Sequence, residues 1–372
     1  MNCEARRVAV TGAGGFVGTN LVLRLCEEGH DVRGIRRDSD LEEAEATLAA
    51  ADVIFHLAGA NRPEDESDYL RSNRDYSAWI ADAVASGGRK PLIVHSSSTR
   101  ALDDSDYGRS KRAGEQILLG LAAEQHATVS IWRLPNLCGK WSRPNYNSVV
   151  ATFCHNAARG LPLRIDDPLA PLSLLYIDDL VDQWLPLISE PAAESGICEP
   201  QRVHQTTVGE IAELIEAFAE SRSRGMIPEV GTGLARALYA TFISALPVTQ
   251  ATYSLNTKTD ARGSFVEVLK TPTAGQFSYF TAHPGVTRGG HYHHTKIEKF
   301  LVAHGTGHFR FRHVLSGEFF ELVSVADQPL IIETIPGWAH DVTNVGEDEL
   351  VVLSWANEQF DPARPDTYPM PL

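Results

Sequence analysis

Several features that restrict protein function are scarce or missing in this sequence. Only 5 Cys occur among 372 residues, and none forms a C-x-x-C pair, so we predict reduced thiols in a cytoplasmic protein. No apolar run approaches the ~18 residues of a membrane span. No apolar segment precedes the first expected strand, as a secretory signal would. We therefore expect a soluble globular protein without a membrane partner.

Basic residues are also in deficit. The chain has 33 Lys and Arg against 48 Asp and Glu, which gives a formal net charge of −15. A protein that binds nucleic acid needs a basic surface to neutralise phosphates, so we expect no nucleic-acid partner. A phosphorylated small substrate is compatible with this charge because it needs only local donors, such as the N-terminus of a helix.

The first two thirds of the chain alternate short apolar strands with amphipathic helices. Strands are expected at 7–11, 31–35, 53–57, 91–95 and 129–134, and helices at 16–28, 70–86, 108–125, 149–159, 208–220 and 234–246. This alternation predicts an α/β domain with a Rossmann-like parallel sheet. From residue 248 short alternating segments punctuated by turns predict an all-β domain. We place the boundary at 247, so the expected domains are 1–247 and 248–372.

Histidines in the β half have a spacing suited to a metal. His291 and His293 are two residues apart, so on a strand their side chains point to the same face. Glu298 reaches the same point if the chain turns back after Lys296, and His340 follows a Pro-Gly turn. Together they offer a nitrogen and oxygen ligand set for a divalent metal. Two alternatives stay open, namely a site that uses these His without metal and a purely structural polar strand.

The segments around these residues read G-x5-H-x-H-x4-E-x6-G and P-G-x2-H-x3-N. They resemble both signature motifs of the cupin superfamily, whose members are small β-barrels with a site at the barrel mouth. The resemblance implies a cupin barrel for the second domain. Aromatic residues at strand spacing are expected to fill the barrel core: Phe265, Phe277, Tyr279, Phe280, Phe300, Phe309 and Phe311.

A glycine-rich turn follows the first expected strand. Gly12, Gly15 and Gly18 are spaced G-x2-G-x2-G, which permits a tight turn and close approach of a pyrophosphate to the backbone. The following helix N-terminus adds free N–H groups and a positive dipole end. The second strand ends at Arg36 and Arg37, and arginine there accommodates the extra phosphate of NADP. We predict NADPH as the cofactor, with NAD as the alternative because Asp38 comes next.

Tyr107 and Lys111 are four residues apart on an expected helix and share one face. An ammonium near a phenol favours the phenolate and lowers its pKa. The tyrosine can then exchange a proton with a carbonyl or an alcohol near neutral pH. The preceding strand ends in consecutive serines at 96–98, which offer a hydroxyl to the same substrate oxygen.

The glycine turn, Leu57-Ala58-Gly59, Asn73, the serines, Y-x3-K and 133–136 occur in one order. Over residues 6–245 they resemble the extended short-chain dehydrogenase/reductase family, in the branch that acts on nucleotide-sugars. The resemblance implies a catalytic triad of Ser98, Tyr107 and Lys111, with Ser97 as the less favoured serine. It places Ser98 and Asn136 at the substrate. It also implies a set of dinucleotide-binding residues: Thr11, Gly12, Gly15, Phe16, Gly18, Arg36, Arg37, Leu57, Ala58, Gly59, Tyr107, Lys111 and Leu134.

The order of the two domains resembles a family of bifunctional capsular-polysaccharide enzymes that act on UDP-4-keto-deoxysugars. The segments 260–267 and 289–294 contribute to this resemblance. It implies that the cupin epimerises C3 of a UDP-2-acetamido-2,6-dideoxy-4-ketohexose. The first domain would then reduce C4 with NADPH to a UDP-2-acetamido-2,6-dideoxy-L-talose, on the route to N-acetyl-L-fucosamine. Zinc in the cupin and a homodimer are also implied.

Three other functions fit the same motifs. The chain could be a nucleotide-sugar reductase whose cupin only dimerises. It could also be an NAD(P)-dependent 4-epimerase, which keeps its cofactor bound through turnover and shows no net consumption of NADPH. It could also be a non-catalytic NADP sensor. An intact set of Ser98, Tyr107 and Lys111 disfavours the sensor, since a sensor needs no proton donor.

Overall fold

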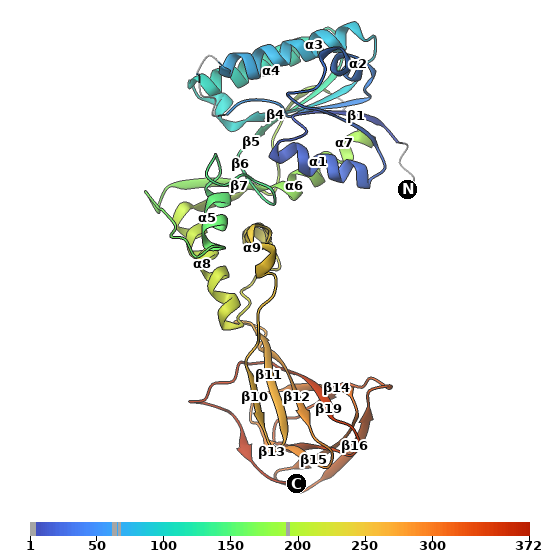
Figure 1. Cartoon of the computed structure of the whole chain (residues 1–372), viewed down its shortest axis with the longest axis vertical. Helices are drawn as coiled ribbons and strands as arrows, with labels where there is room; N and C mark the ends of the chain where they lie inside the picture. The colour runs from blue at the N-terminus through green and yellow to red at the C-terminus, as the bar shows by residue number, and fades with distance from the viewer. Residues whose placement is uncertain (1–4, 62–64, 66–67, 191–193) are drawn as a thin grey trace. The chain divides into compact units, whose positions relative to one another are not determined.

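A computed structural model describes residues 5–61, 65, 68–190 and 194–372. The chain forms two compact units (Figure 1). The first contains residues 1–215 and 233–246, and the second contains 216–232 and 247–372. The second unit thus takes in 216–232, which the sequence analysis assigned to the first domain.

The first unit is built on a parallel sheet of six strands in the order β2-β1-β3-β4-β5-β8. Its strands are β1 Arg7–Thr11, β2 Asp31–Ile35, β3 Val53–His56, β4 Leu92–Ser98, β5 Thr128–Leu134 and β8 Gly196–Cys198. The central strands are apolar along their length because both sheet faces are covered. The predicted Rossmann-like sheet is confirmed. Its order reverses between β1 and β3, where ligands of such sheets bind.

Helices cover both faces of this sheet, with α2, α3 and α4 on one side and α1 on the other (Figure 1). They are α1 Phe16–Glu27, α2 Leu41–Ala50, α3 Tyr76–Ser86 and α4 Asp106–Ala123. The sequence analysis missed α2, because only Ala44 and Leu48 of this helix are buried and its apolar stripe is short. A π-helical turn, η1 Leu70–Asp75, precedes α3 within the helix expected at 70–86.

A small second sheet, β6-β7-β9, completes the first unit with five further helical segments. The elements are β6 Asn136–Cys138, α5 Val149–Ala157, β7 Pro171–Tyr176, α6 Ile177–Trp184, α7 Pro186–Ser189, β9 His204–Thr207, α8 Val208–Arg224 and α9 Gly233–Ala245. The last turns of α8 belong to the second unit. No helix in the described ranges has the length and hydropathy to cross a membrane.

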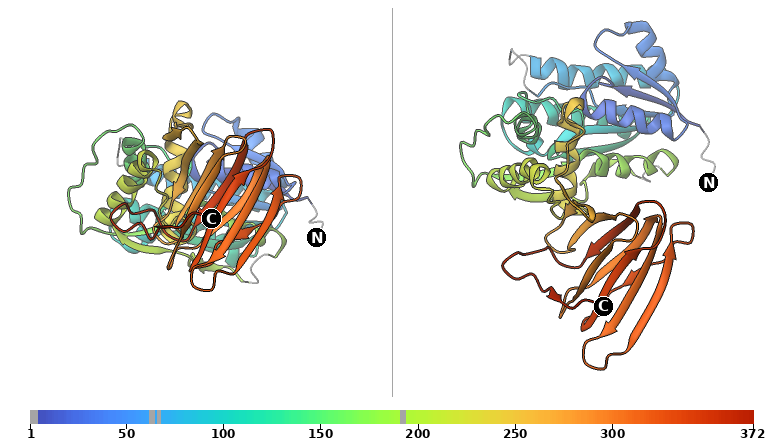
Figure 2. Two further views of the ribbon diagram at one scale, coloured as in Figure 1. Left: turned by 90° about the horizontal axis from the view of Figure 1, so that it is seen from below. Right: turned by 60° about the horizontal axis from the view of Figure 1, so that its bottom comes forward.

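The second unit consists of two mainly antiparallel sheets (Figure 2). One has the order β10-β11-β12-β19-β14-β17 and the other β16-β15-β18-β13-β20. The strands are β10 Thr257–Asp260, β11 Gly263–Lys270, β12 Gln276–Ala282, β13 Thr287–Tyr292, β14 Glu298–His304, β15 Thr306–His313, β16 Phe319–Val325, β17 Ile332–Glu333, β18 Trp338–Asn344, β19 Leu350–Ala356 and β20 Tyr368–Pro369. Val302, Phe309 and Val352 contribute to a common core of both sheets. This arrangement is consistent with the predicted cupin-like domain.

Two glycines of the second unit provide a matched test of its packing. Gly275 and Gly317 both have a φ of +73°, but a Cβ at Gly275 would lie 1.8 Å from the Ala356 carbonyl oxygen, whereas Gly317 faces open space. We expect Gly317→Ala to lower the free energy of unfolding only by the backbone strain, about 1–2 kcal/mol. Gly275→Ala should add an overpacking cost of about 1–3 kcal/mol. Amide hydrogen exchange in β12 and β19 measures both effects, and equal losses would contradict the prediction.

Candidate functional site

The four residues predicted to bind a metal converge in the second unit. His291 on β13 pairs directly with His340 on β18 across the strand ladder. Glu298 begins β14, which belongs to the opposite sheet. His293 follows the last residue of β13 and is 1% exposed. The two sheets therefore both contribute to one cluster, in which all four ligand atoms lie within 4.8 Å of one another.

Glu298 is the centre of this cluster. Its Oε2 atom lies 3.1 Å from His293 Nε2 and 3.4 Å from His340 Nε2. Burial alone would raise the Glu298 pKa, but hydrogen bonds and attraction from His293 and His340 outweigh burial and hold that pKa well below its usual value. Glu298 is therefore a carboxylate at neutral pH. Burial, assisted by the neighbouring His340, lowers the pKa of His291 to about 4, so its imidazole is neutral and can donate a lone pair.

The other ring nitrogens of two histidines have backbone partners. His293 Nδ1 lies 2.6 Å from the Asp366 carbonyl oxygen, and His340 Nδ1 lies 3.4 Å from that of Trp338. A carbonyl only accepts, so each Nδ1 carries a proton, and each Nε2 faces the Glu298 carboxylate that would share a bound metal with it. His340 Nε2 is buried 3.4 Å from Glu298 Oε2 and has no other polar partner among the described residues. These features fit a divalent metal bound by imidazole nitrogens and a carboxylate oxygen.

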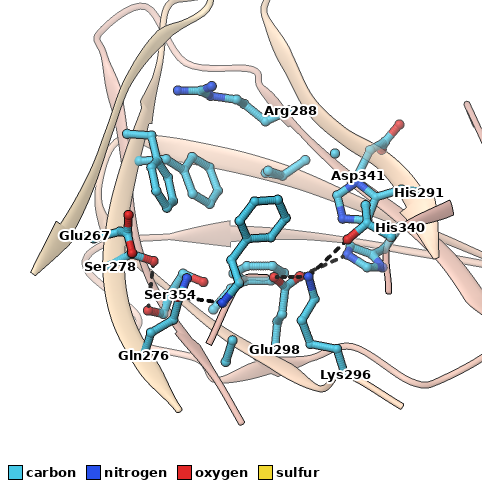
Figure 3. Close-up of a pocket in the computed structure, with 18 of the residues that line it drawn as sticks. Glu267, Gln276, Ser278, Arg288, His291, Lys296, Glu298, His340, Asp341 and Ser354 are labelled. Carbon is cyan, nitrogen blue, oxygen red and sulfur yellow. Dashed lines mark hydrogen bonds and ion pairs between the residues drawn. The ribbon is translucent and has the colours of Figure 1, made fainter. Parts of the chain in front are cut away.

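The cluster opens into a cavity of about 480 Å3 inside the second unit. Figure 3 shows Lys296, Glu298, His291 and His340 at one end, and polar Gln276, Ser278 and Glu267 at the other. Three cations also line the cavity, and they are Lys258, Arg262 and Arg288. The aromatic residues were expected to be core. Phe309 is core and also lines the cavity, whereas Phe265 and Phe280 are only partly buried and form cavity wall.

The first unit places the glycine turn at the switch point of its sheet. Gly12 has a φ of +67°, and a Cβ there would meet the Ala58 nitrogen at 2.9 Å. A Cβ at Gly18 would meet the Gly12 carbonyl oxygen at 2.2 Å. No side chain caps the N-terminus of α1 at Gly15, so the N–H groups of its first turn, at 16–18, can face a ligand. The turn thus fits a pyrophosphate, as the spacing predicted.

The neighbouring strand ends complete this edge of the sheet. The Thr11 hydroxyl accepts hydrogen bonds from the Leu57 and Ala58 nitrogens at 3.2 Å, which ties the end of β1 to the segment that contains Gly59. Arg36 lies over the turn, with its Nε 3.9 Å from a Cβ built at Gly14. Arg37 is exposed beside it. An exposed guanidinium at this place can reach the ribose side of a dinucleotide.

The structure separates the two serines that the sequence left open. Ser97 is buried, and its hydroxyl donates to Glu115 Oε1 at 2.5 Å. Glu115 also forms an ion pair with Arg133, at 2.6 Å. The Ser98 side chain instead hydrogen-bonds to Tyr107. Ser98 is therefore the serine beside the tyrosine, and Ser97 belongs to a buried structural network.

The expected pKa effect of Lys111 on Tyr107 does not occur in this structure. Burial raises the pKa of Tyr107, against smaller opposing effects of Ser98 and Arg100. The Lys111 ammonium donates to the Ser96 carbonyl oxygen at 3.0 Å, and burial lowers its pKa to about 8. Tyr107 is thus a protonated acid at neutral pH, which suits a group that donates a proton to a carbonyl.

The remaining predicted residues lie near this pair. Leu134 is the register partner of Ser98 on the adjacent strand. Asn136 begins β6 and is exposed. Sequence analysis did not single out Glu115, which lies one helical turn after Lys111, or Asp366 of the C-terminal segment. A one-turn spacing could have indicated Glu115, whereas no local pattern indicates that Asp366 contacts residues some 70 positions earlier.

Comparisons with known proteins agree with both units. Residues 8–197 match the NAD dependent epimerase/dehydratase family, and residues 258–368 match the polysaccharide biosynthesis C-terminal domain. The chain belongs to the NAD dependent epimerase/dehydratase family, and it uses a nicotinamide cofactor. The UDP-2-acetamido-2,6-beta-L-arabino-hexul-4-ose reductase of Pseudomonas aeruginosa is 47% identical over 363 residues, which cover 97% of this chain and 98% of that protein.

Solved structures show the same relationship. The capsular polysaccharide assembling protein CapF from Staphylococcus aureus has a TM-score of 0.92 at 41% identity, over 98% of this chain and 100% of that chain. WbmF from Bordetella bronchiseptica, in complex with NAD+, has a TM-score of 0.54 at 18% identity, over 64% of this chain and 91% of that chain. At that identity the second likeness concerns the fold alone.

The histidine cluster predicts that the protein binds one Zn²⁺ per chain. At free Zn²⁺ about 100 times Kd, binding should stabilise the second unit by ~2.7 kcal/mol. His291→Ala should weaken binding by more than the ~10–100-fold that loss of an outer-shell partner costs. His308→Ala is the matched control, because His308 pairs with an exposed Glu321 outside the cluster. Competition with a chromophoric chelator measures the affinities, and equal Zn²⁺ affinity of both variants would contradict the assignment.

Proposed function

We propose that this protein is a bifunctional nucleotide-sugar enzyme with one reaction in each unit. The second unit epimerises C3 of a UDP-2-acetamido-2,6-dideoxy-4-ketohexose. The first unit then reduces the C4 ketone with NADPH to a UDP-2-acetamido-2,6-dideoxy-L-talose, a precursor of UDP-N-acetyl-L-fucosamine for capsule or O-antigen. The observation that carries the proposal is the presence of two built sites in one chain, together with full-length similarity to a UDP-hexulose reductase.

The order of the reactions follows from the chemistry of the ketone. A carbonyl at C4 acidifies the proton on C3, and a base can remove it to give an enolate. Reprotonation of C3 on the other face inverts that carbon. Reduction of C4 removes the carbonyl and with it the acidity, so epimerisation comes first. The cavity at the histidine cluster has the size of a sugar site and combines aromatic wall with polar groups.

Divalent metal, which we infer to be zinc, would be held by His291, His293, Glu298 and His340. When bound, such an ion supplies Lewis-acid stabilisation for a negatively charged oxygen. Lys296 lines the same end of the cavity, where its ammonium favours negative charge on the substrate. Arg288 donates to the Thr281 and Ser264 carbonyl oxygens, and Asp260 is near enough to attract its charge. We propose that this guanidinium pairs with the diphosphate of the substrate.

In the first unit, NADPH would lie across the switch point, with its pyrophosphate at the glycine turn and its ribose phosphate near Arg36 and Arg37. Bound NADPH would supply a hydride to C4 of the sugar, and the Tyr107 hydroxyl would give its proton to the C4 oxygen. Ser98 hydrogen-bonds to the same oxygen, while Lys111, whose ammonium donates to the Ser96 carbonyl oxygen, would bind the cofactor. Asn136 contacts the substrate. NADP+ and the C4 alcohol are the products.

Cellular setting and assembly are part of the same proposal. We infer a cytoplasmic protein, because the described cysteines are free thiols, and a homodimer, which the resemblance to the bifunctional capsular-polysaccharide enzymes implies. The preference for NADPH over NAD is supported by two exposed arginines at the end of the second strand. Neither nucleic acid nor a membrane is expected as a partner, given the net charge of −15.

Hydrogen exchange at C3 tests the division of labour between the units. The protein is incubated with a UDP-4-keto-6-deoxy-N-acetylhexosamine in D2O without NADPH, and C3 is followed by NMR. We expect deuterium at C3 with wild type and with Tyr107→Phe, but not with His291→Ala. NADPH should then be required only for reduction. Exchange no faster than in the enzyme-free control would contradict C3 epimerisation of this substrate.

The two serines provide a second test, in the reductase site. Ser98→Ala should lower the single-turnover rate of NADPH oxidation by roughly 10²-fold, because it removes a donor to the reacting oxygen. Ser97→Ala should leave that rate nearly unchanged and cost about 1 kcal/mol of stability, because it removes a buried hydrogen bond to Glu115. Stopped-flow absorbance of NADPH measures the rates. A larger rate loss in Ser97→Ala than in Ser98→Ala would reverse the assignment.

A further inference from the structure

The last residues of the chain form a segment that lies against the histidine cluster. β20 pairs with β13 in antiparallel register, with Pro369 opposite His291 and Tyr368 opposite Tyr292. The Met370 nitrogen donates to the Gly290 carbonyl oxygen at 2.8 Å. The Tyr292 and Tyr368 rings stack with centroids 5.3 Å apart. The C-terminal segment is thus built into the wall of the cluster.

Asp366 is the residue of this segment with the most contacts to the cluster. Its carboxylate accepts four hydrogen bonds from the turn that follows His293. They come from the His294 nitrogen at 2.9 Å, the Thr295 nitrogen and hydroxyl at 2.8 and 2.9 Å, and the Lys296 nitrogen at 2.8 Å. Three of these four bonds end on Oδ2. A single carboxylate therefore closes the turn between His293 and Glu298.

The main chain of Asp366 acts on the histidine itself. Its carbonyl oxygen accepts from His293 Nδ1 at 2.6 Å, and this bond directs His293 Nε2 at the Glu298 carboxylate, 3.1 Å away. The backbone of Asp366 is in the left-handed region, with φ of 36°. Asp and Asn tolerate this region better than other side-chain-bearing residues do.

Among the four cluster residues, His293 is the one that contacts the Asp366 carbonyl oxygen, whereas the other three are held by other bonds. His291 and His340 are held by their strand pairing, and Glu298 exchanges hydrogen bonds with Thr334 through both its nitrogen and its carbonyl oxygen. His293 lies outside β13. Its carbonyl oxygen accepts from the Gly337 nitrogen. Its ring is held between Glu298 Oε2 and the Asp366 carbonyl oxygen, and of these two partners Asp366 lies outside the cluster.

We propose that Asp366 is a positioning residue for the metal site, with its carboxylate closing the turn at 294–296 and its carbonyl oxygen orienting the ring of His293. The inference rests on the proposed metal-binding function of the second unit. It assigns to the C-terminal segment the role of presenting His293 Nε2 to a divalent cation. Outer-shell groups that orient a ligand histidine in this way raise metal affinity.

Asp366→Asn in the full-length protein tests the inference with little change in size or backbone preference. The amide NH2 group of Asn takes the place of one carboxylate oxygen. The N–H and O–H groups of the turn at 294–296 then meet a hydrogen-bond donor where they had an acceptor. We expect Zn²⁺ affinity to fall by roughly 10–100-fold and the visible absorption of the Co²⁺-loaded protein to change. Asp366→Gly, which removes the carboxylate and permits the left-handed φ, should weaken Zn²⁺ binding in the same direction.

Asp361→Asn is the matched control in the same segment, because the Asp361 carboxylate accepts only from the nearby Ala363 nitrogen among the bonds described. It should bind Zn²⁺ like wild type. Wild-type affinity and an unchanged Co²⁺ spectrum in both Asp366 variants would overturn the inference while leaving the metal site and the proposed function intact. A wild-type protein that binds no Zn²⁺ would overturn the inference together with the metal part of the proposed function, whereas C3 exchange would still be measured independently.

Discussion

The site of the second unit depends on the contacts between the Glu298 carboxylate and the imidazoles around it. The Glu298 side chain is only 17% exposed, and a buried charge is costly unless partners compensate it. Here the partners come from the opposite sheet and from the segment after β13. The same contacts that offset the cost of burial bring His291, His293 and His340 to one point. Organisation of the site and tolerance of the charge therefore have the same physical origin.

The first unit uses a buried carboxylate in a different way. The Glu115 side chain is 3% exposed. It forms an ion pair with Arg133 and accepts a hydrogen bond from Ser97, so these two partners compensate its negative charge. The Ser97 hydroxyl is therefore engaged by Glu115, whereas the Ser98 side chain lies beside Tyr107. In both units a buried carboxylate, Glu298 or Glu115, fixes the position of the side chains that bind it. The difference is that the Glu298 partners can bind a metal, whereas the Glu115 partners form a closed ion pair.

Lys111 and Tyr107 show that shared helical spacing does not establish an electrostatic effect. Their positions on α4 follow from the four-residue spacing, yet burial is the main influence on the pKa of each side chain. The ammonium contacts the Ser96 carbonyl oxygen. A protonated tyrosine next to a lysine with a lowered pKa suits proton donation to a ketone, and this is the direction that the proposed reduction needs.

The parallel sheet, its glycine turn and the β character of the second unit could be predicted from the sequence, because these follow from local periodicity and from spacings of a few residues. It also indicated the four cluster residues, since His291, His293 and Glu298 are close in the chain. The short helix α2 was missed for lack of a strong apolar stripe. The different partners of Ser97 and Ser98, and the contacts of Asp366, became visible only in the folded chain. Each depends on a side chain or backbone oxygen supplied from a distant position, and no local pattern in a single sequence encodes such a contact.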